Sequence, residues 1–554
     1  MFIDDATFTR HGKTYRRVLL RNSYRFNGQV RHDTLANLSY CSDDEIRAIK
    51  LALKHKGQLT YVGDLREEVS TRQGLAVGAV WVLHQLAKRL GLVKALGQSR
   101  TAKLALWLVL ASVIAQGSRL SAVRLAQQHA VCDLLGLEAF NEDDLYQAMD
   151  WLNEQQPAIE EALFTHRYAP AGQAPTLYLY DVTSSYLEGD QNELGEYGYN
   201  RDGKKQIVVG LLTDEEGWPI TVEVFAGNTQ DPKTFKAQID KMVQRFGVKQ
   251  VTLVGDRGMI KTVQISDVKD AGFHYLTAIT KPQIEALLKT EVLWLSMFDE
   301  DLVEVTTEEV RYIVRRNPQR AEELAAVRQS KRERLDNYLA QKNAYLADHP
   351  RAKVETALKN AQAKANQLKI HAWAKLNVEE RRLALAVDED AQRVATRLDG
   401  CYVIKTDLPP EVASSETAHA RYKGLAEVEY AFRTMKTTLL EMRGIFVRKA
   451  TRTRAHVFVI MLAYLLAYQL RRLWHEVELT VEEGIAELAS ICAIELTLSN
   501  QTTCQLIPEP RPLGKLLLEK ADITLPDAIP HKGITVVTRK NWFRSVNLSN
   551  IKLL

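Results

Sequence analysis

The order of strand-like and helix-like runs between residues 175 and 282 limits the fold of this 554-residue chain more than any other feature. Three apolar or alternating runs, LYLYDVTSSYL, KQIVVGLLTDE and WPITVEVFAGN, predict three successive strands. The helical run TFKAQIDKMVQRFG then leads to a fourth strand, QVTLVGD. A strand–helix–strand connection makes that strand parallel to the first, and the right-handed crossover sets the two side by side. The pattern therefore predicts an α/β domain built on a mixed sheet.

An aspartate stands at the end of each of the two strands predicted to be neighbours. Asp181 ends the apolar part of the first run, and Asp256 follows 75 positions later at the end of QVTLVGD. Parallel neighbours would let the two carboxylates approach each other. Either aspartate alone could be a cap or turn former. Glu188 and Asp190 fall in the loop after the first strand and rank below Asp181 as ligands.

A third acid lies in residues 421–436, RYKGLAEVEYAFRTMK, which we interpret as one helix. Tyr422, Glu429 and Lys436 are seven positions apart and would project from one face, with Arg433 four residues after Glu429. A carboxylate can hold a divalent cation while neighbouring cations hold a phosphate backbone. The alternative is a solvated helix face with ordinary charge pairs.

Together these segments resemble the acidic triad of ribonuclease-H-like DDE transposases from bacterial insertion sequences. The resemblance is to the superfamily whose third acid lies in a Tyr-x2-Arg-x3-Glu-x6-Lys signature. The corresponding positions here are Tyr422, Leu425, Glu429 and Lys436. The spacing matches, but Leu425 replaces the family arginine, and Arg421 and Arg433 are the nearest substitutes.

The resemblance implies both the fold and the chemistry of the chain. Asp181, Asp256 and Glu429 would be catalytic and would hold two Mg²⁺ ions, with Mn²⁺ able to substitute. The substrates would be double-stranded DNA, namely the inverted-repeat ends of a transposon and a target, cut and then joined. The protein would act as a homodimer in the DNA complex. Other readings are a nuclease that cuts without joining, or an inactive DNA-binding remnant or repressor.

Basic residues near the third acid are candidates for contacts to the DNA backbone. The chain carries 73 basic and 69 acidic residues, so DNA binding must depend on local clusters and not on bulk charge. The resemblance assigns Tyr422 and Lys436 to the transposon end. The predicted track also includes Arg433, Arg443, Arg448, Lys449 and Arg452. An ordinary charged surface is the alternative reading of this cluster.

Flanking regions divide the rest of the chain. We expect a basic mixed region at 1–62, either a DNA-contacting arm or a solvated sheet, and a helical domain at 63–170, either end-binding or a plain bundle. The expected fold is thus a ribonuclease-H-like core, at 175–282 and 399–475, preceded by a mainly helical N-terminal domain. Residues 476–554 would form a C-terminal helix and a tail of short strands that could serve dimerisation.

An insertion at 283–398 separates the two parts of the predicted core. It begins with alternating runs and continues as a helical hairpin broken at Pro350. Related transposases that form DNA hairpins stack a flipped base on an aromatic residue of the insertion. Trp294 and Trp373 are the candidates, and burial in a core is the competing fate of each.

Two further features bear on location. Five scattered cysteines with no CxxC pair indicate reduced thiols and neither a disulfide framework nor a zinc site. The apolar runs near residues 105–115 and 457–470 are shorter than the roughly 20 residues of a membrane span and predict buried helices. We therefore expect a bacterial cytoplasmic protein without a membrane segment, associated with the nucleoid when bound to DNA.

Overall fold

The structure is a computed structural model. It describes residues 1–539 except 11, 55, 57–68, 173, 199–202, 231–232, 236–240, 243–244, 247–250, 257–259, 261, 308–309, 437–439, 441, 443–444, 499–502, 530–531, 535 and 537–538. The chain divides into two compact units. The first comprises residues 1–75, 492–508 and 526–531, and the second comprises residues 76–491, 509–525 and 532–554.

The first unit begins with an antiparallel sheet. Its strands are β1 (Phe2–Arg10), β2 (Lys13–Phe26) and β3 (Gln29–Asn37), in the order β1-β2-β3. Asn27 and Gly28 join the last two, and both have positive φ, as a tight hairpin turn requires. Helix α1 (Asp43–Lys54) starts at a capping box, where the Glu45 carboxylate accepts from the Ser42 backbone N–H at 2.7 Å. The expectation of a mainly helical N-terminal domain is therefore wrong here, because the alternating runs pair with one another as a sheet.

A second small sheet in this unit joins distant parts of the chain. Strands β4 (Val69–Ala76), β15 (Cys492–Leu498) and β16 (Thr503–Leu506) lie in the order β16-β15-β4. The tail therefore forms short strands, as predicted, but the pairing of β15 with β4 was not anticipated.

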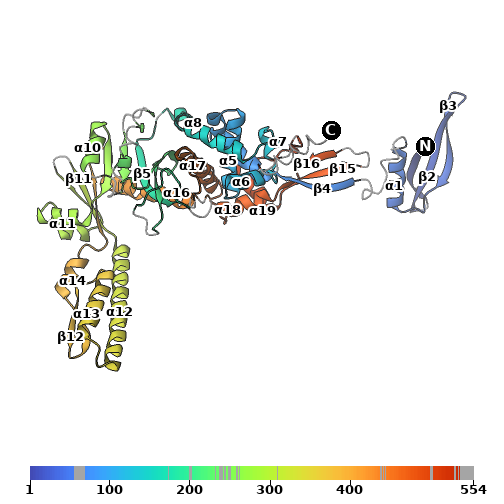
Figure 1. Ribbon diagram of the computed structural model, residues 1–554. Coiled ribbons are helices and arrows are strands. Elements are labelled where there is room, and N and C mark those ends of the chain that lie inside the picture. The colour runs from blue at the N-terminus through green and yellow to red at the C-terminus, as the bar shows by residue number, and fades with distance from the viewer. Residues whose placement is uncertain are drawn as a thin grey trace, which may run out of the picture. The chain divides into compact units, whose positions relative to one another are not determined.

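The second unit opens with the predicted helical region. Its helices are α3 (Gly78–Arg89), α4 (Leu92–Leu96), α5 (Arg100–Ile114), α6 (Arg119–Ala126), α7 (Val131–Leu135) and α8 (Glu142–Tyr168), followed by the short helix η2 (Ala169–Ala171). Asn141 caps α8, because its side chain accepts from the N–H groups of Asp143 and Asp144. Helices α5 and α8 pack against α17 (Ala450–Leu473) (Figure 1).

The core of this unit is an eight-stranded mixed sheet in the order β10-β11-β14-β9-β8-β5-β6-β7. Its strands are β5 (Leu177–Tyr186), β6 (Gln206–Asp214), β7 (Pro219–Ala226), β8 (Thr252–Gly255), β9 (His274–Ala278), β10 (Val303–Thr306), β11 (Arg311–Arg316) and β14 (Cys401–Thr406). Strand β8 pairs in parallel with β5 and β9, and the other pairs are antiparallel. The predicted succession of three strands and a parallel fourth is confirmed. The short helices α10 (Thr262–Asp270), α11 (Lys281–Lys289) and η3 (Leu295–Asp299) lie between the later strands in sequence.

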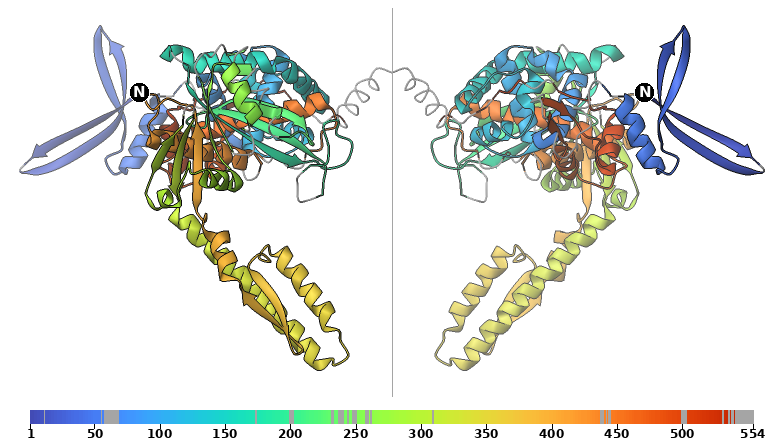
Figure 2. Two further views of the ribbon diagram at one scale, coloured as in Figure 1. Left: turned by 90° about the vertical axis from the view of Figure 1, so that its left-hand side faces the viewer. Right: turned by 90° about the vertical axis from the view of Figure 1, so that its right-hand side faces the viewer.

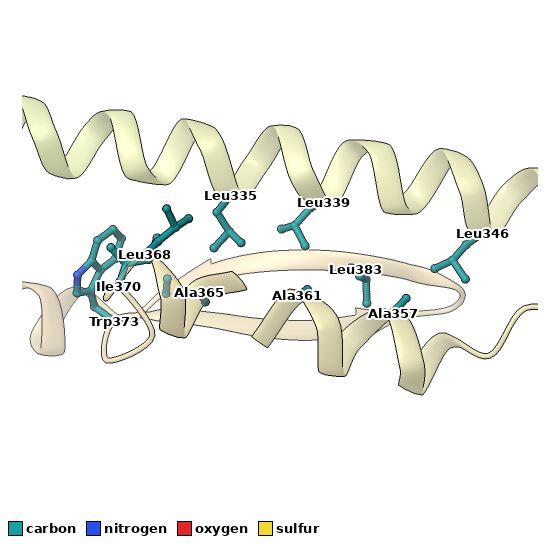
Figure 3. Packing of buried hydrophobic residues seen from close by; sticks show 11 residues of the cluster. Leu335, Leu339, Leu346, Ala357, Ala361, Ala365, Leu368, Ile370, Trp373 and Leu383 are labelled. Atoms are coloured by element: carbon teal, nitrogen blue, oxygen red, sulfur yellow. The ribbon is translucent and has the colours of Figure 1, made fainter. Parts of the chain in front are cut away.

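A helical hairpin follows β11. Its two arms are α12 (Pro318–Asp348) and α13 (Val354–Gln367). The two-stranded sheet of β12 (Ala374–Glu379) and β13 (Arg382–Val387) and the helix α14 (Glu389–Thr396) follow the hairpin in the chain. Helices α12 and α13, yellow in Figure 2, run side by side. Leucines of α12 point toward the small residues of α13 and toward β13, which gives the hairpin a core of its own (Figure 3). Trp373 is part of that core and only 3% exposed, whereas Trp294 is 53% exposed.

The segment predicted as one helix at 421–436 is interrupted. Helix α15 (Ser415–Lys423) ends at Gly424, and α16 (Leu425–Lys436) starts after it. The N–H of Gly424 is shared between the carbonyls of Ala420 and Arg421, which tightens the turn. Glycine loses more conformational freedom on folding than any other residue and is unfavourable in a helix interior, so the break falls there. Tyr422 consequently belongs to a different helix from Glu429.

Two more helices complete the second unit. Helix α18 (Val481–Ala489) is the predicted C-terminal helix and begins with a capping box of Thr480 and Glu483. Helix α19 (Pro512–Ala521) was not predicted, since its leucines follow a proline-rich stretch that favoured irregular structure.

Helix α17 is the only described helix that by itself has the length and composition of a membrane span. Within its most apolar window 83% of the residues are buried inside the protein. Helices α5 and α6 pass the same test only as a pair bent by 91°. Packing against α5 and α8 accounts for the apolar composition of α17.

Candidate active site

The sheet register brings the positions of the two predicted aspartates next to each other. In the parallel ladder of β5 and β8, Tyr180 is opposite Gly255, and the following residues are Asp181 and Asp256. Neighbouring strands lie about 4.8 Å apart, and residues in register on parallel strands point to the same face. Asp256 is exposed and Asp181 is partly buried.

Helix α16 lies along strand β5 and is held at both ends (Figure 1). At its start, a Cβ built on Gly424 would lie 3.6 Å from the Cδ1 atom of Leu179, which is van der Waals contact and places the start of the helix against β5. At its end, the Lys436 ammonium donates a hydrogen bond to the hydroxyl of Thr183. Leu179, Asp181 and Thr183 alternate along β5 and therefore share one face. The face that carries Asp181 is thus the face that α16 covers.

Glu429 lies on one flank of α16. The helix buries Val428, Ala431, Phe432 and Met435. At 100° per residue, Glu429 and Lys436 both project about 90–110° from the centre of that buried face, on the same side of it. Lys436 reaches Thr183 from this flank, so the same flank carries Glu429 along β5 between the two anchor points. Glu429 itself is exposed.

The three carboxylates do not converge into a single coordination sphere. Among the described residues, no group of three or more His, Cys, Asp or Glu side chains is close enough to hold a metal ion. The elements that carry the acids are adjacent, but only Asp181 and Asp256 occupy matched positions. The chemistry of the donor set fits a hard divalent cation, since all three candidates offer carboxylate oxygens and at least two of them are exposed.

The predicted basic residues differ in their environments. Arg433, Arg448 and Lys449 are exposed, whereas Tyr422 is partly buried. Arg443 lies outside the described residues. Arg452 makes a bidentate ion pair with Asp150 on α8, with N–O distances of 2.9 and 2.8 Å. This guanidinium holds the pKa of Asp150 below its usual value, and the positive charge is compensated within the protein.

A buried ion pair fixes the start of α15 against the sheet. Arg311 on β11 is almost fully buried, donates to the carbonyl oxygens of Leu408 and Ala413, and pairs with Glu304 at 2.8 Å. Hydrogen bonds from Arg311 and Ser415 lower the pKa of Glu304 to about 2. Ser415 is the first residue of α15, so this network sets where the two consecutive helices begin.

Two residues that position the site were not identified from the sequence. Thr183 accepts a hydrogen bond from Lys436, and Gly424 lies at the joint of α15 and α16, next to Leu179. The alternation of β5 offered a signal for Thr183, because it lies two positions after Asp181 and so on the same face. The glycine inside a helical pattern was a signal for the break.

Comparison with known proteins identifies the chain. Residues 172–466, more than half of the chain, match the family model described as Transposase DDE domain. Residues 4–61 match the model described as IS1634 family transposase, N-terminal domain. No curated protein matches the chain. The first match implies a ribonuclease-H-like fold, with which the mixed sheet around β5 and β8 agrees, together with DNA binding and a general use of divalent metal. The chain therefore belongs to the DDE transposases, enzymes of DNA transposition, and carries the N-terminal domain of the IS1634 family.

Proposed function

We propose that this transposase cuts both ends of its own element and joins them to a target, using Asp181, Asp256 and Glu429 as the metal-binding acids. The observation that supports this assignment most directly is the register of β5 and β8, in which the two aspartates follow a matched pair of residues. The run of α16 along β5 adds the third acid from the helix that covers the Asp181 face of that strand. The proposed metal is Mg²⁺, for which Mn²⁺ would substitute.

A pair of bound divalent cations would lower the pKa of an attacking water or 3′ hydroxyl and stabilise the leaving oxygen. The residues of the chain would hold the metal ions and orient the DNA phosphate. The carboxylates of Asp181 and Asp256 would hold their positions through the sheet ladder, whose hydrogen bonds resist displacement along the strand. Lys436, whose ammonium donates to the Thr183 hydroxyl beside the site, would hold a phosphate oxygen of the DNA through its positive charge.

The DNA backbone would follow the flank of α16 toward the start of α17. Arg433 and Lys436 lie on α16, and Arg448 and Lys449 immediately precede α17. Tyr422 would contribute from α15, and Arg443 belongs to the same proposed track. Arg452 would reach a phosphate only by leaving Asp150, so we assign it a structural role at the start of α17. A homodimer would hold two element ends together, which cross-linking of the DNA complex can test.

Trp294 is the better candidate for stacking on an unpaired base if cleavage passes through a DNA hairpin. Its side chain is 53% exposed, whereas Trp373 is 3% exposed and packs among the leucines of the hairpin core. Stacking needs an accessible ring, and Trp294 provides one. Trp294→Ala would then leave first-strand nicking intact and impair second-strand cleavage. Equal rates of both steps in this variant would remove Trp294 from the mechanism.

The test of the proposed function is a reaction of the purified full chain with Mg²⁺, a labelled duplex that ends in the inverted repeat of its element, and a plasmid target. Labelled end joined to plasmid supports transposition. Cut but unjoined ends would indicate a nuclease, and binding without cutting would indicate an inactive DNA-binding protein. Glu429→Gln and Asp256→Asn are the matched inactive controls, because each keeps the side-chain size and removes the charge that a metal requires.

A further inference from the structure

An open groove lies between helices α12 and α14 of the insertion. Its volume is about 530 Å³, within the range of roughly 300–1,000 Å³ typical of small-molecule sites. The lining residues of each helix follow the first of them at offsets of three, four and seven, so they form one face of that helix. Those of α12 are Ala325, Arg328, Gln329 and Arg332, and those of α14 are Glu389, Gln392, Arg393 and Thr396. We call this site the arginine groove.

The two helix faces that form the arginine groove are polar, although faces with this spacing usually pack through apolar side chains. Helix α14 has no fully buried residue and packs against the hairpin core through Ala391. The lining carries three guanidinium groups and one carboxylate, that of Glu389, so its formal charge is +2. Residues 318–398 hold 16 basic and 11 acidic side chains, a net charge of +5, against +4 for the whole chain. The groove therefore favours an anion.

The three arginines differ in how firmly they are held. Arg328 is mostly buried and pairs with Asp399, so its guanidinium forms a fixed part of the wall. Arg332 and Arg393 are exposed, and among the described residues each pairs with an acid one turn away on its own helix, at 3.8 Å and 3.2 Å. Exposed pairs of this kind contribute little to stability, so a ligand phosphate can take the place of the acid.

An unused hydrogen-bond donor also belongs to the lining. Trp373 is 3% exposed, and its indole N–H donates to none of the described residues. The indole nitrogen lies on the side of the ring away from Leu335 (Figure 3). The carbonyl of Trp373 accepts from the N–H of Asp388, the N-cap residue of α14, which keeps the ring beside that helix. A donor without a partner in so buried a side chain is costly, and a ligand acceptor recovers that cost.

A phosphate group matches these donors. A guanidinium presents paired N–H groups that fit two phosphate oxygens, and the two exposed arginines reach the groove from different helices. The side-chain amides of Gln329 and Gln392 can bond to neighbouring oxygens. The groove is larger than one inorganic phosphate, so its ligand includes the sugar attached to the phosphate.

We propose that the arginine groove binds a sugar phosphate, on helices that carry none of the candidate metal-binding acids. Arg332 and Arg393 would hold the phosphate, Arg328 would fix one wall, and the indole N–H of Trp373 would donate to an oxygen of the ligand. Two sources present this chemistry, the backbone of DNA and a free nucleoside triphosphate. The DNA source rests on the proposed function, whereas the nucleotide source does not.

The experiment measures two affinities of the purified full chain in buffer with EDTA and no divalent cation. Calorimetry follows the binding of ATP, and anisotropy follows the binding of a labelled element-end duplex between about 50 and about 200 mM salt. The test variant is the double replacement Arg332→Ala with Arg393→Ala. The matched control is Arg320→Ala, because this arginine of α12 is 60% exposed and pairs with Glu323 one turn away but does not line the groove.

We expect the double variant to weaken ATP binding by at least about tenfold, since two charge-assisted contacts are lost, and the control to change it by less than about twofold. If the groove holds DNA, the double variant also flattens the salt dependence of duplex binding by about 1.8 counterions, at about 0.9 for each phosphate contact. A flatter slope thus assigns the groove to DNA. Weaker ATP binding with an unchanged slope assigns it to a free nucleotide.

Trp373→Phe tests the groove without changing its charge. This variant keeps an aromatic ring in the hairpin core, and loss of the indole N–H should weaken binding of the ligand about two- to tenfold. Tm is measured on the same samples, and the two exposed arginine positions should leave it nearly unchanged, so that weaker binding by the double variant cannot be ascribed to unfolding.

Three outcomes would overturn the proposal. They are unchanged binding of both ligands by the double variant, equal effects of the double variant and Arg320→Ala, and unchanged binding of both ligands by Trp373→Phe. Neither measurement requires cleavage. A failed strand-transfer assay therefore leaves the arginine groove intact, and a groove that binds no phosphate leaves the proposed function intact.

Discussion

Arg448, just before α17, and Arg452, in its first turn, should behave differently when each is replaced by alanine. Arg448 is exposed beside the proposed DNA track, whereas Arg452 pairs in bidentate fashion with Asp150 and lies 4.8 Å from the ring of Tyr146. A phosphate contact releases about 0.9 counterion in duplex DNA, and an ion pair inside the protein releases none on DNA binding.

The magnitude follows from the salt range used. Raising salt from about 50 to about 200 mM is a fourfold change, so each lost phosphate contact makes the salt-induced loss of affinity about 3.5-fold smaller. Arg448→Ala should show that change and Arg452→Ala should not. Arg452→Ala should instead lower Tm by about 2 °C, since a partly exposed pair of this geometry contributes about 1 kcal/mol.

The assay is fluorescence anisotropy of a labelled element-end duplex at four or five salt concentrations, with Tm measured on the same samples. Arg472→Ala is a matched control, because that arginine pairs with Glu216 near the other end of α17. Asp150→Asn should steepen the salt dependence by releasing Arg452 toward DNA. A flatter slope for Arg452→Ala together with an unchanged slope for Arg448→Ala would refute the assignment of the two arginines.

Three further changes test the site and the insertion. Asp181→Asn should reduce Mg²⁺-dependent nicking at least about a hundredfold while gel-shift affinity for the end stays within about twofold; substantial nicking would remove Asp181 from the triad. Glu304→Gln should cost about 2–4 kcal/mol at pH 7, because the buried guanidinium of Arg311 loses its counter-charge. The folded-state pKa of Glu304 is lowered to about 2, so its contribution is complete above the ordinary value of 4.5 and disappears as pH falls toward 2. The Tm difference between the two proteins should shrink over that interval, and a constant difference would contradict the ion-pair account. Leu339→Ala should destabilise the hairpin core by about 2–5 kcal/mol and speed proteolysis of residues 318–367, whereas Val327→Ala, 51% exposed, should not; equal proteolysis would show that the hairpin has no core of its own.

Features encoded within a few residues were predictable from the sequence. The capping boxes at Ser42 and Thr480 and the cap at Asn141 involve partners at most three positions away, so the local pattern contains all of the interaction. The adjacency of Asp181 and Asp256 was also accessible. Alternation identifies the strands, and the strand–helix–strand order with its right-handed crossover leaves one arrangement for them.

Only the tertiary structure decided which of two similar residues is buried or charge-compensated and which is exposed. Trp294 and Trp373 are equivalent in the sequence, yet only the packing of α12 against α13 buries one of them. In the sequence Arg448 and Arg452 belong to one basic cluster. They differ in the structure because Arg452 pairs with Asp150, which is 302 positions away from it. The pairing of β4 with β15 likewise joins two ends of the chain. Short-range patterns carry propensity, whereas burial and charge compensation depend on partners that only the folded chain brings together.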